Sequence, residues 1–444
     1  MSDVDVLYTS SSQLTQKSGI QQLVLSHGSE LEEISNIPCF FWGSITDSLL
    51  TAKCLMTISR VVRANYGPVD LTLFDPIVSA GTDQLRFEGF SSCNGVYARL
   101  DLLEDAIDGE FIASGTTNVD FNEPMLHALN SIKKGEKMVM GVGSKEVSVS
   151  TAKSKVVERK VSLPTRWIKG LTSVQLFLAG MEERFRLNKI QIIPLFQSIP
   201  KTAVKSNFYL SKRANKFVFS PIQTKDSVFI GGIHRLRLLE GLLPYCDHLI
   251  VYQEKDAETV CFVMDFGKMR LSLALSPSAY RGFSGEGNVL ENMIQTVPDE
   301  WVQAVNSLLK SNEMFDPTLL SIEHDVNFDT MDALTASLSS IGLLGYDLNE
   351  SQHYYRRLPF KMSRILALNP RLKNARKLVS DESVEFKVNT PPYIEAKVKG
   401  TDVEHTVIIN GDQFRCTCNW FTNHQGQRGL CKHILAVKML TKDG

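Results

Sequence analysis

The chain has 444 residues, of which 43% are hydrophobic and 22% are charged. This composition is typical of a folded, multi-domain protein and excludes an intrinsically disordered one. The first residues, Met1–Ser12, carry no basic stretch followed by an apolar one, and no apolar run reaches the ~20 residues of a membrane helix. We therefore expect a cytoplasmic protein that does not enter a membrane.

The formal net charge of −1 conceals an uneven distribution of charge along the chain. From Arg356 onward there are sixteen basic and eight acidic residues, a balance of +8, whereas the rest of the chain balances to −9. The basic residues of this block that best suit phosphate binding are Arg356, Arg357, Arg371, Lys373, Arg376 and Lys377. The block would suit DNA or RNA, but an acidic protein surface would also attract it, so both classes of partner stay open.

The first half of the chain predicts mixed α and β structure. An amphipathic helix is predicted between Asp47 and Ala64, with Asp47 as its N-cap, and a strand is predicted at Leu85–Phe90. A second amphipathic helix is predicted from Pro164 to Phe185. Three apolar strands of a β-rich stretch follow, at His248–Gln253, Thr259–Phe266 and Arg270–Ser276.

Farther along, three helices are predicted at Trp301–Leu309, Pro317–His324 and Asp329–Ile341, before two short strands at Gly345–Leu348 and His353–Leu358. This order resembles a winged helix, with a generic helical bundle and hairpin as the alternative. The expected fold class is α+β with four regions. These are an N-terminal α+β domain (1–195), a β-rich middle domain (196–295), a winged-helix-like segment (296–360), and basic helices with a finger made of a small β-sheet and a helix (361–444).

The eight cysteines divide into two groups. Five stand singly among apolar neighbours, as buried core residues do: Cys39, Cys54, Cys93, Cys246 and Cys261. The other three form two tight pairs with a histidine, Cys416-Thr417-Cys418 and Cys431-Lys432-His433, separated by twelve residues. A hairpin signal at Asn410-Gly411 precedes the first pair, and an apolar helix follows the second. Because three thiolates and one imidazole complete a tetrahedron, we expect Cys416, Cys418, Cys431 and His433 to bind one structural Zn²⁺.

The pattern Cys-x-Cys, a spacer, and Cys-x-His ahead of an apolar helix resembles the signature of the SWIM zinc finger. Phe414–Val437 is similar to the finger of a large group of bacterial SWIM proteins, although Asn419 stands where that group would have proline. The resemblance extends upstream to Asp75–Asp101, Gly115–Asn122, Glu158–Gly170, Arg281–Leu290 and Gly345–Phe360.

This resemblance implies a finger that binds protein or nucleic acid and whose zinc is not catalytic. It also implies a class of partner, because members of the group are commonly encoded beside MoxR-like ATPases and von Willebrand factor A proteins. Within the finger, His424 is an alternative ligand. Trp420 and Phe421 could stack on bases, but a small zinc domain needs such residues for its core.

No catalytic constellation is complete in the sequence. Cys93 with His127 could be drawn as a nucleophile and base, but no third group orients them. The glycine-rich stretches Gly141–Lys145 and Gly282–Gly287 lack the sequence of a phosphate-binding loop and are interpreted as turns. We therefore expect no enzyme, but a non-catalytic zinc-binding adaptor for a protein partner. The alternative is a nucleic-acid-binding protein that uses the finger and the basic block.

Overall fold

The computed structural model describes most of the chain: residues 4–8, 13–17, 20–25, 27–28, 39–66, 76–81, 83–119, 121–143, 159–163, 165–204, 206–254, 259–277, 282–283, 314–323, 327–360, 370–400, 403–426 and 429–442. The chain divides into two compact units. Unit 1 comprises Met1–Ser284 and Tyr346–Phe360, and unit 2 comprises Gly285–Gly345 and Lys361–Gly444. None of the described helices combines the length and the apolar composition needed to cross a bilayer.

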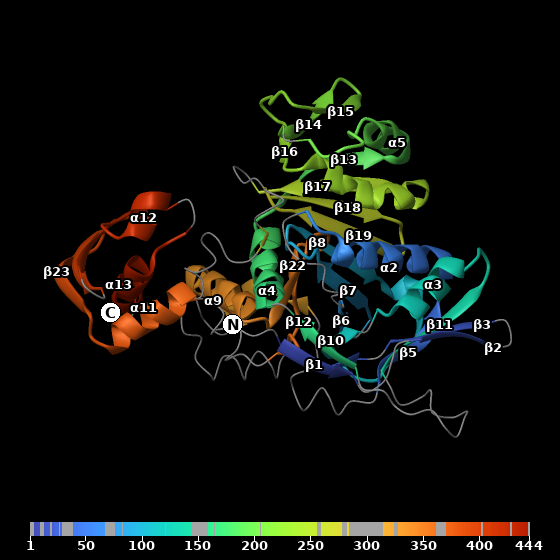
Figure 1. Cartoon of the computed structure of the whole chain (residues 1–444), viewed down its shortest axis with the longest axis horizontal. Coiled ribbons are helices and arrows are strands. Elements are labelled where there is room, and N and C mark those ends of the chain that lie inside the picture. Colours follow the sequence, from blue (N-terminus) through green and yellow to red (C-terminus); the bar gives the residue numbers. More distant parts are fainter. Residues whose placement is uncertain are drawn as a thin grey trace. The chain divides into compact units, whose positions relative to one another are not determined.

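The described part of unit 1 is organised around an antiparallel sheet of nine strands (Figure 1). Their spatial order is β13 (Glu182–Asn188), β17 (His248–Gln253), β18 (Val260–Asp265), β19 (Met269–Leu275), β8 (Val96–Leu102), β7 (Leu85–Phe90), β6 (Ile77–Ala80), β10 (Gly115–Val119) and β4 (His27–Gly28). Every residue of the central strands β7 and β8 is buried, because the sheet is covered on both faces. The sheet takes strands from both sides of the expected domain boundary after residue 195.

Three smaller sheets also lie in unit 1. The largest has the order β2 (Gln13–Lys17), β3 (Ile20–Leu25), β11 (Lys137–Gly143), β5 (Cys39–Ile45) and β9 (Ile107–Phe111). The others pair β1 (Val4–Tyr8) with β12 (Arg159–Leu163), and β15 (Lys216–Ser220) and β16 (Val228–Ile230) with β14 (Phe208–Arg213). Gly141–Gly143 therefore lie in strand β11, and the predicted turn there is wrong.

The described residues of unit 1 also form helices. They are α2 (Ser48–Arg63), α3 (Glu123–Ser131), α4 (Thr165–Ala179), α5 (Lys189–Gln197) and two 3₁₀ segments, η1 (Glu104–Ala106) and η3 (Ile233–Tyr245). Helix α2 lies against β7 and β8, and Asp47 caps it by accepting a hydrogen bond from the Leu50 N–H at 3.0 Å. Helix α4 ends at Ala179, so the prediction that it continues to Phe185 is wrong. The chain turns after Gly180, and Phe185 belongs to strand β13.

Charged side chains line one face of the central strands, where the cross-strand register pairs Arg86 with Asp101 and Glu88 with Arg99. All four are buried, together with Arg356 and Asp347. Arg356 donates from Nη1 to both carboxylate oxygens of Glu88 at 2.6 and 2.7 Å. Three buried guanidinium groups are thus paired with three buried carboxylates at this face, and this balance of charge is what makes their burial tolerable. Arg356, which the sequence suggested as a phosphate-binding residue, is therefore buried and paired with Glu88 instead.

In unit 2, the second and third predicted helices of the winged-helix-like segment correspond to α8 (Pro317–Glu323) and α9 (Phe328–Ser340). The strands β20 (Met314–Phe315), β21 (Leu344–Asp347) and β22 (Gln352–Tyr355) are close to this segment in the sequence, and β22 belongs to unit 1. The first predicted helix, Trp301–Leu309, lies outside the described residues. The winged-helix assignment therefore stays a prediction.

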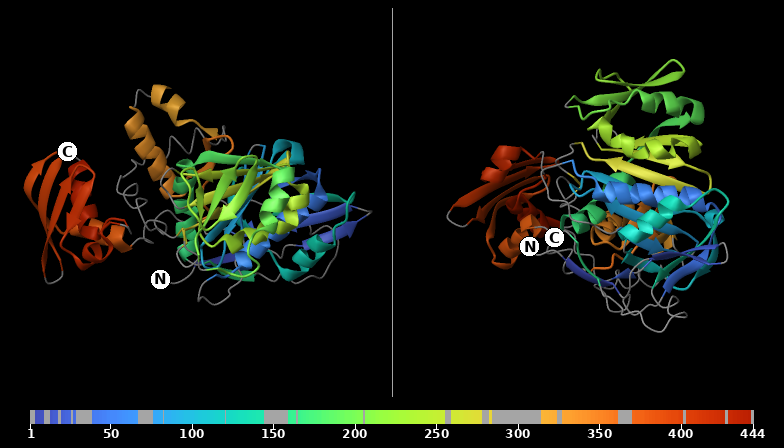
Figure 2. Two further views of the ribbon diagram at one scale, coloured as in Figure 1. Left: turned by 90° about the horizontal axis from the view of Figure 1, so that it is seen from above. Right: turned by 45° about the vertical axis from the view of Figure 1, so that its right-hand side comes forward.

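The C-terminal part of unit 2 is a four-stranded antiparallel sheet with helices beside it (Figure 2). In spatial order the strands are β23 (Val384–Thr390), β24 (Tyr393–Lys399), β25 (Glu404–Asn410) and β26 (Gln413–Cys416). The helices are α11 (Pro370–Ser380), α12 (Asn419–His424) and α13 (Lys432–Lys442). Helix α13 packs against β23, β25 and β26 and also against α11. The basic helix α11 is therefore part of the finger.

Candidate metal centre

The hairpin β25–β26 brings the first pair of predicted ligands to its end. Gly411 has a φ of 56°, which a two-residue turn of this kind requires and which glycine adopts without steric cost. The register that follows pairs Val407 with Cys416. Cys418 comes two residues later as the N-cap of α12, where its Sγ accepts a hydrogen bond from the Phe421 N–H at 3.5 Å. The sheet and the short helix thus fix the positions of both thiols.

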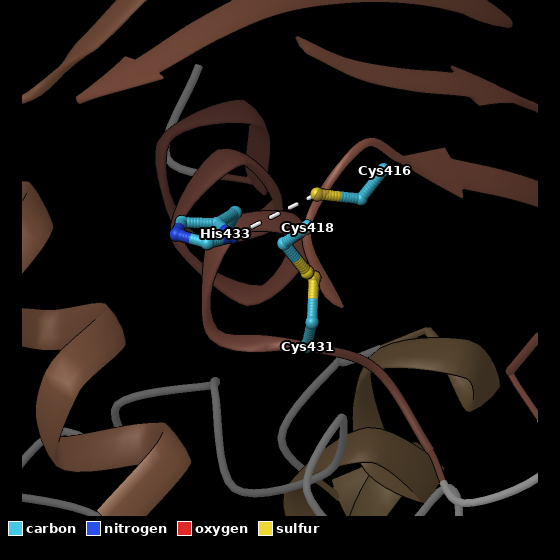
Figure 3. A group of neighbouring side chains, drawn as sticks. All are labelled: Cys416, Cys418, Cys431 and His433. Atoms are coloured by element: carbon cyan, nitrogen blue, oxygen red, sulfur yellow. Dashed lines mark hydrogen bonds between the residues drawn. The ribbon is translucent and has the colours of Figure 1, made fainter. Parts of the chain in front are cut away.

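The second pair lies at the start of α13. The Cys431 carbonyl accepts the hydrogen bond of the Leu435 N–H at 3.0 Å, and His433 occupies the first turn of the helix. The apolar residues that follow, Ile434, Leu435, Ala436 and Val437, are fully buried. Their burial anchors α13 to the sheet and so holds Cys431 and His433 opposite Cys416 and Cys418 (Figure 3).

The four predicted ligands converge. Their ligand atoms all lie within 4.8 Å of one another, and the Cys416 Sγ is 3.7 Å from the His433 Nδ1. The side chains of Cys416, Cys418, Cys431 and His433 are all buried. In a tetrahedral zinc site with Zn–S distances of ~2.3 Å, neighbouring sulfurs are about 3.8 Å apart, so small side-chain rotations suffice to close these donors around one ion. The described residues contain no second group of three or more His, Cys, Asp or Glu side chains placed to bind a metal.

The electrostatics of the cluster favour a cation. Hydrogen bonds from Cys416 and Cys431 lower the pKa of Cys418, whereas the contacts with Cys418 and Cys431 raise the pKa of Cys416. Thiolates this close to one another repel, so the cluster alone opposes the ionisation of all three thiols. A divalent cation at the centre would remove that repulsion and allow all three to ionise. The donor set therefore fits zinc.

His433 has a neighbour that sequence reasoning missed. The ring of His405 packs on the ring of His433 with their centroids 4.3 Å apart, and partial burial lowers the pKa of His405. The Nε2 of His433 is buried without a hydrogen-bond partner among the described residues, so its Nδ1 faces the thiols. Side chains alternate between the two faces of strand β25, and His405 is on the same inward face as Val407 and Ile409. This alternation is the sequence signal that could have indicated the contact.

The other finger residues considered from the sequence have packing roles. Phe421 is buried, and Trp420 is half-buried with its ring 4.5 Å from the Arg371 guanidinium and 4.5 Å from the His424 ring. Arg371 also donates to the Leu430 carbonyl at 3.0 Å. His424 therefore contacts Trp420 and is not part of the metal cluster. These contacts connect α11 to the loop between the two ligand pairs.

In unit 1, the five isolated cysteines are buried, as predicted. Burial raises the pKa of Cys246 and of Cys261 to about 12, so neither thiol ionises readily. Cys93 is buried in the turn after β7, with its Sγ 3.4 Å from the Ser91 Oγ, whereas His127 is exposed on α3.

No family model and no curated protein matches the sequence. Among solved structures, proliferating cellular nuclear antigen from Entamoeba histolytica is similar over 54% of this chain and 99% of its own, with 9% identity and a TM-score of 0.36. The A. fulgidus PCNA bound to the C-terminal region of FEN-1 is similar over 53% of this chain and 98% of its own, with 12% identity and a TM-score of 0.32. Because both TM-scores are below 0.5, neither likeness supports an inference about this chain.

Proposed function

We propose that this protein binds one structural zinc ion through Cys416, Cys418, Cys431 and His433, and that the finger so stabilised is an interaction module. The observation that carries the proposal is the convergence of four buried donors of the types zinc prefers. With four protein ligands the metal has no position for water or substrate, so its role is to hold β26, α12 and α13 together. The site is accordingly non-catalytic.

The favoured role is that of an adaptor for a protein partner. Helix α11 packs on α13, and the finger thereby has a compact core of its own. One face of its sheet is left to solvent, as the exposed Tyr393, Lys399 and Arg415 show. The resemblance to SWIM proteins adds a partner class, a MoxR-like ATPase or a von Willebrand factor A protein. The −9 balance of the chain before Arg356 further favours protein over a long polyanion.

Binding of nucleic acid is a second candidate, which rests on the charges of α11. Lys373 and Lys377 are exposed and form no ion pair within the described residues, while Arg376 is half-buried. The basic residues of the finger sheet differ, because Lys387 is paired with Glu385 and Lys397 with Glu404. Unpaired positive charge on a helix is what phosphate groups would contact.

The zinc proposal is tested by the metal content of the purified full-length chain. We expect about one zinc per chain by elemental analysis after purification without chelators. Cys431→Ser should lose the metal because a hydroxyl is a poor zinc ligand. Cys246→Ser is the matched control, since this buried thiol lies outside the cluster. A wild-type chain without stoichiometric zinc would refute the proposal.

The partner class is tested by affinity capture from native cells with and without nuclease. A protein that is retained after nuclease treatment, and that is lost with the zinc-free Cys431→Ser chain, would support the adaptor role. Capture that nuclease abolishes would instead favour the nucleic-acid candidate.

A further inference from the structure

A groove of about 530 Å³ lies on the finger beside the metal cluster. Its walls come from β25, from β26 with the following Thr417, and from α12. The residues that line it are Thr406, Ile408, Phe414, Arg415, Cys416, Thr417, Phe421, Thr422 and Gln425. Because the zinc ligands Cys416 and Cys418 fix β26 to α12, the shape of this groove depends on the metal site.

The groove is bounded on one side by β26, the edge strand of the sheet. Strand β26 is the last strand in the order β23-β24-β25-β26, and among the described residues it pairs with β25 alone. In an antiparallel pair, every second residue directs its N–H and C=O away from its neighbour. The hairpin closes at the pair Asn410–Gln413, so the main-chain groups of Phe414 face outward. An open edge of this kind is a template for an additional extended segment.

The lining of the groove specifies the chemistry of such a segment. Ile408 is half-buried and Phe421 is buried, and these two apolar side chains belong to the lining of the groove. Arg415 is exposed and has no ion pair within the described residues, and no carboxylate lines the groove. The groove is thus apolar and positively charged.

We propose that this groove binds an extended peptide segment of a partner protein that carries apolar side chains and at least one acidic side chain. The peptide main chain pairs with the edge of β26, an apolar side chain contacts Ile408 and Phe421, and the carboxylate pairs with Arg415. This inference rests on the proposed role of the finger as a protein-interaction module and identifies its binding surface. A single-stranded nucleic acid in the same groove is the competing occupant.

The test uses the full-length, zinc-loaded chain and a displayed library of random twelve-residue peptides. Enriched peptides are synthesised, and their affinities are measured by fluorescence anisotropy. We expect them to contain an acidic residue and to bind at least about tenfold more weakly to Arg415→Glu, because the variant replaces an attraction by a repulsion. Thr422→Arg, which fills the groove with a long side chain, should also weaken binding. Lys399→Glu is the charge-reversal control on the exposed part of β24 and should bind normally.

Zinc content is measured for every variant, so that loss of the finger is not mistaken for loss of the groove. Protection of the Gln413–Thr417 amides from hydrogen exchange by a bound peptide would support the proposal. Failure to enrich any peptide, enriched peptides without acidic residues, or affinities unaffected by Arg415→Glu would overturn it. So would protection of the same amides by a single-stranded oligonucleotide in place of the peptides. If Arg415→Glu still captures a nuclease-resistant partner from cells, the groove proposal fails while the adaptor role stands.

Discussion

Arg356 and Glu88, which are 268 residues apart in the sequence, form an ion pair whose side chains are both completely buried. Arg356 also donates from Nη2 to the Leu171 carbonyl at 2.7 Å, and the Tyr97 hydroxyl donates to Glu88 at 2.7 Å. The pair therefore ties the segment Tyr346–Phe360 to the central strands of unit 1. Removing this ion pair should therefore lower the stability of unit 1.

The first prediction is that Glu88→Leu lowers the free energy of opening of β7 and β8 by about 3–5 kcal/mol, because it leaves a buried guanidinium unpaired. Replacing both partners, in Glu88→Leu/Arg356→Met, should recover much of this loss. The measurement is hydrogen exchange of the β7 and β8 amides. As a control, Arg186→Met removes an exposed ion pair with Glu183 and should cost at most about 1 kcal/mol. If Glu88→Leu lowers the free energy of opening by no more than Arg186→Met does, this prediction is wrong.

A second prediction concerns pH. Burial lowers the pKa of His353 to about 4, whereas an unfolded histidine has a pKa of about 6.5. Between these values the unfolded state binds more protons, so the contribution of His353 to stability is lost as the pH falls from about 6.5 to about 4. His353→Gln should flatten this part of the stability curve, measured by urea unfolding at several pH values. The same substitution at the exposed His248 is the control, and an unchanged slope in His353→Gln would refute the prediction.

The third prediction is that removing zinc with a chelator unfolds the finger and spares the sheet of unit 1. The finger depends on the metal because its core is small, whereas β17, β18 and β19 bury nearly all of their residues. Hydrogen exchange should show loss of protection in β24, β25 and α13, with β17–β19 unchanged. Restored protection on adding zinc back would show reversibility. An equal loss of protection in the finger and in β17–β19 would contradict the prediction, because it would mean that the metal stabilises the whole chain.

A fourth prediction separates the two partner classes. Labelled single- and double-stranded DNA and RNA are titrated with the protein at two salt concentrations. We expect any binding to fall steeply with salt and to be negligible at physiological ionic strength, because the chain before Arg356 carries a balance of −9. The charge reversal Lys373→Glu/Lys377→Glu uses the two exposed lysines of α11. Binding that persists at physiological salt and is lost in this variant would contradict the adaptor role.

Sequence reasoning succeeded where the determinants are local. The strands β17, β18 and β19 were predictable because short apolar runs are separated by turns such as that at Gly267. The four donors of the metal cluster were predictable because their types and spacing are themselves the signal. The end of α4 was not predictable from periodicity, because Met181 and Phe185 continue the helical spacing while the chain has already turned at Gly180.

Long-range contacts account for the rest of what the sequence did not reveal. Arg356 stands in a basic stretch that suggests phosphate binding, and nothing near it in the sequence indicates Glu88 as its partner. The groove beside β26 was not predictable for the same reason, because it forms only when β25, β26 and α12 come together in the fold. Neither feature has a local pattern that a reading of consecutive residues would detect.

The central claim, that one zinc ion is held by three thiolates and one imidazole, is tested most directly by zinc K-edge X-ray absorption of the purified full-length chain. We expect one zinc per chain, with about three sulfur neighbours at ~2.3 Å and one nitrogen at ~2.0 to 2.1 Å. In His433→Cys the nitrogen shell should be replaced by a fourth sulfur while the metal is retained. A coordination shell dominated by oxygen or nitrogen, or a chain that holds no stoichiometric zinc, would contradict the account.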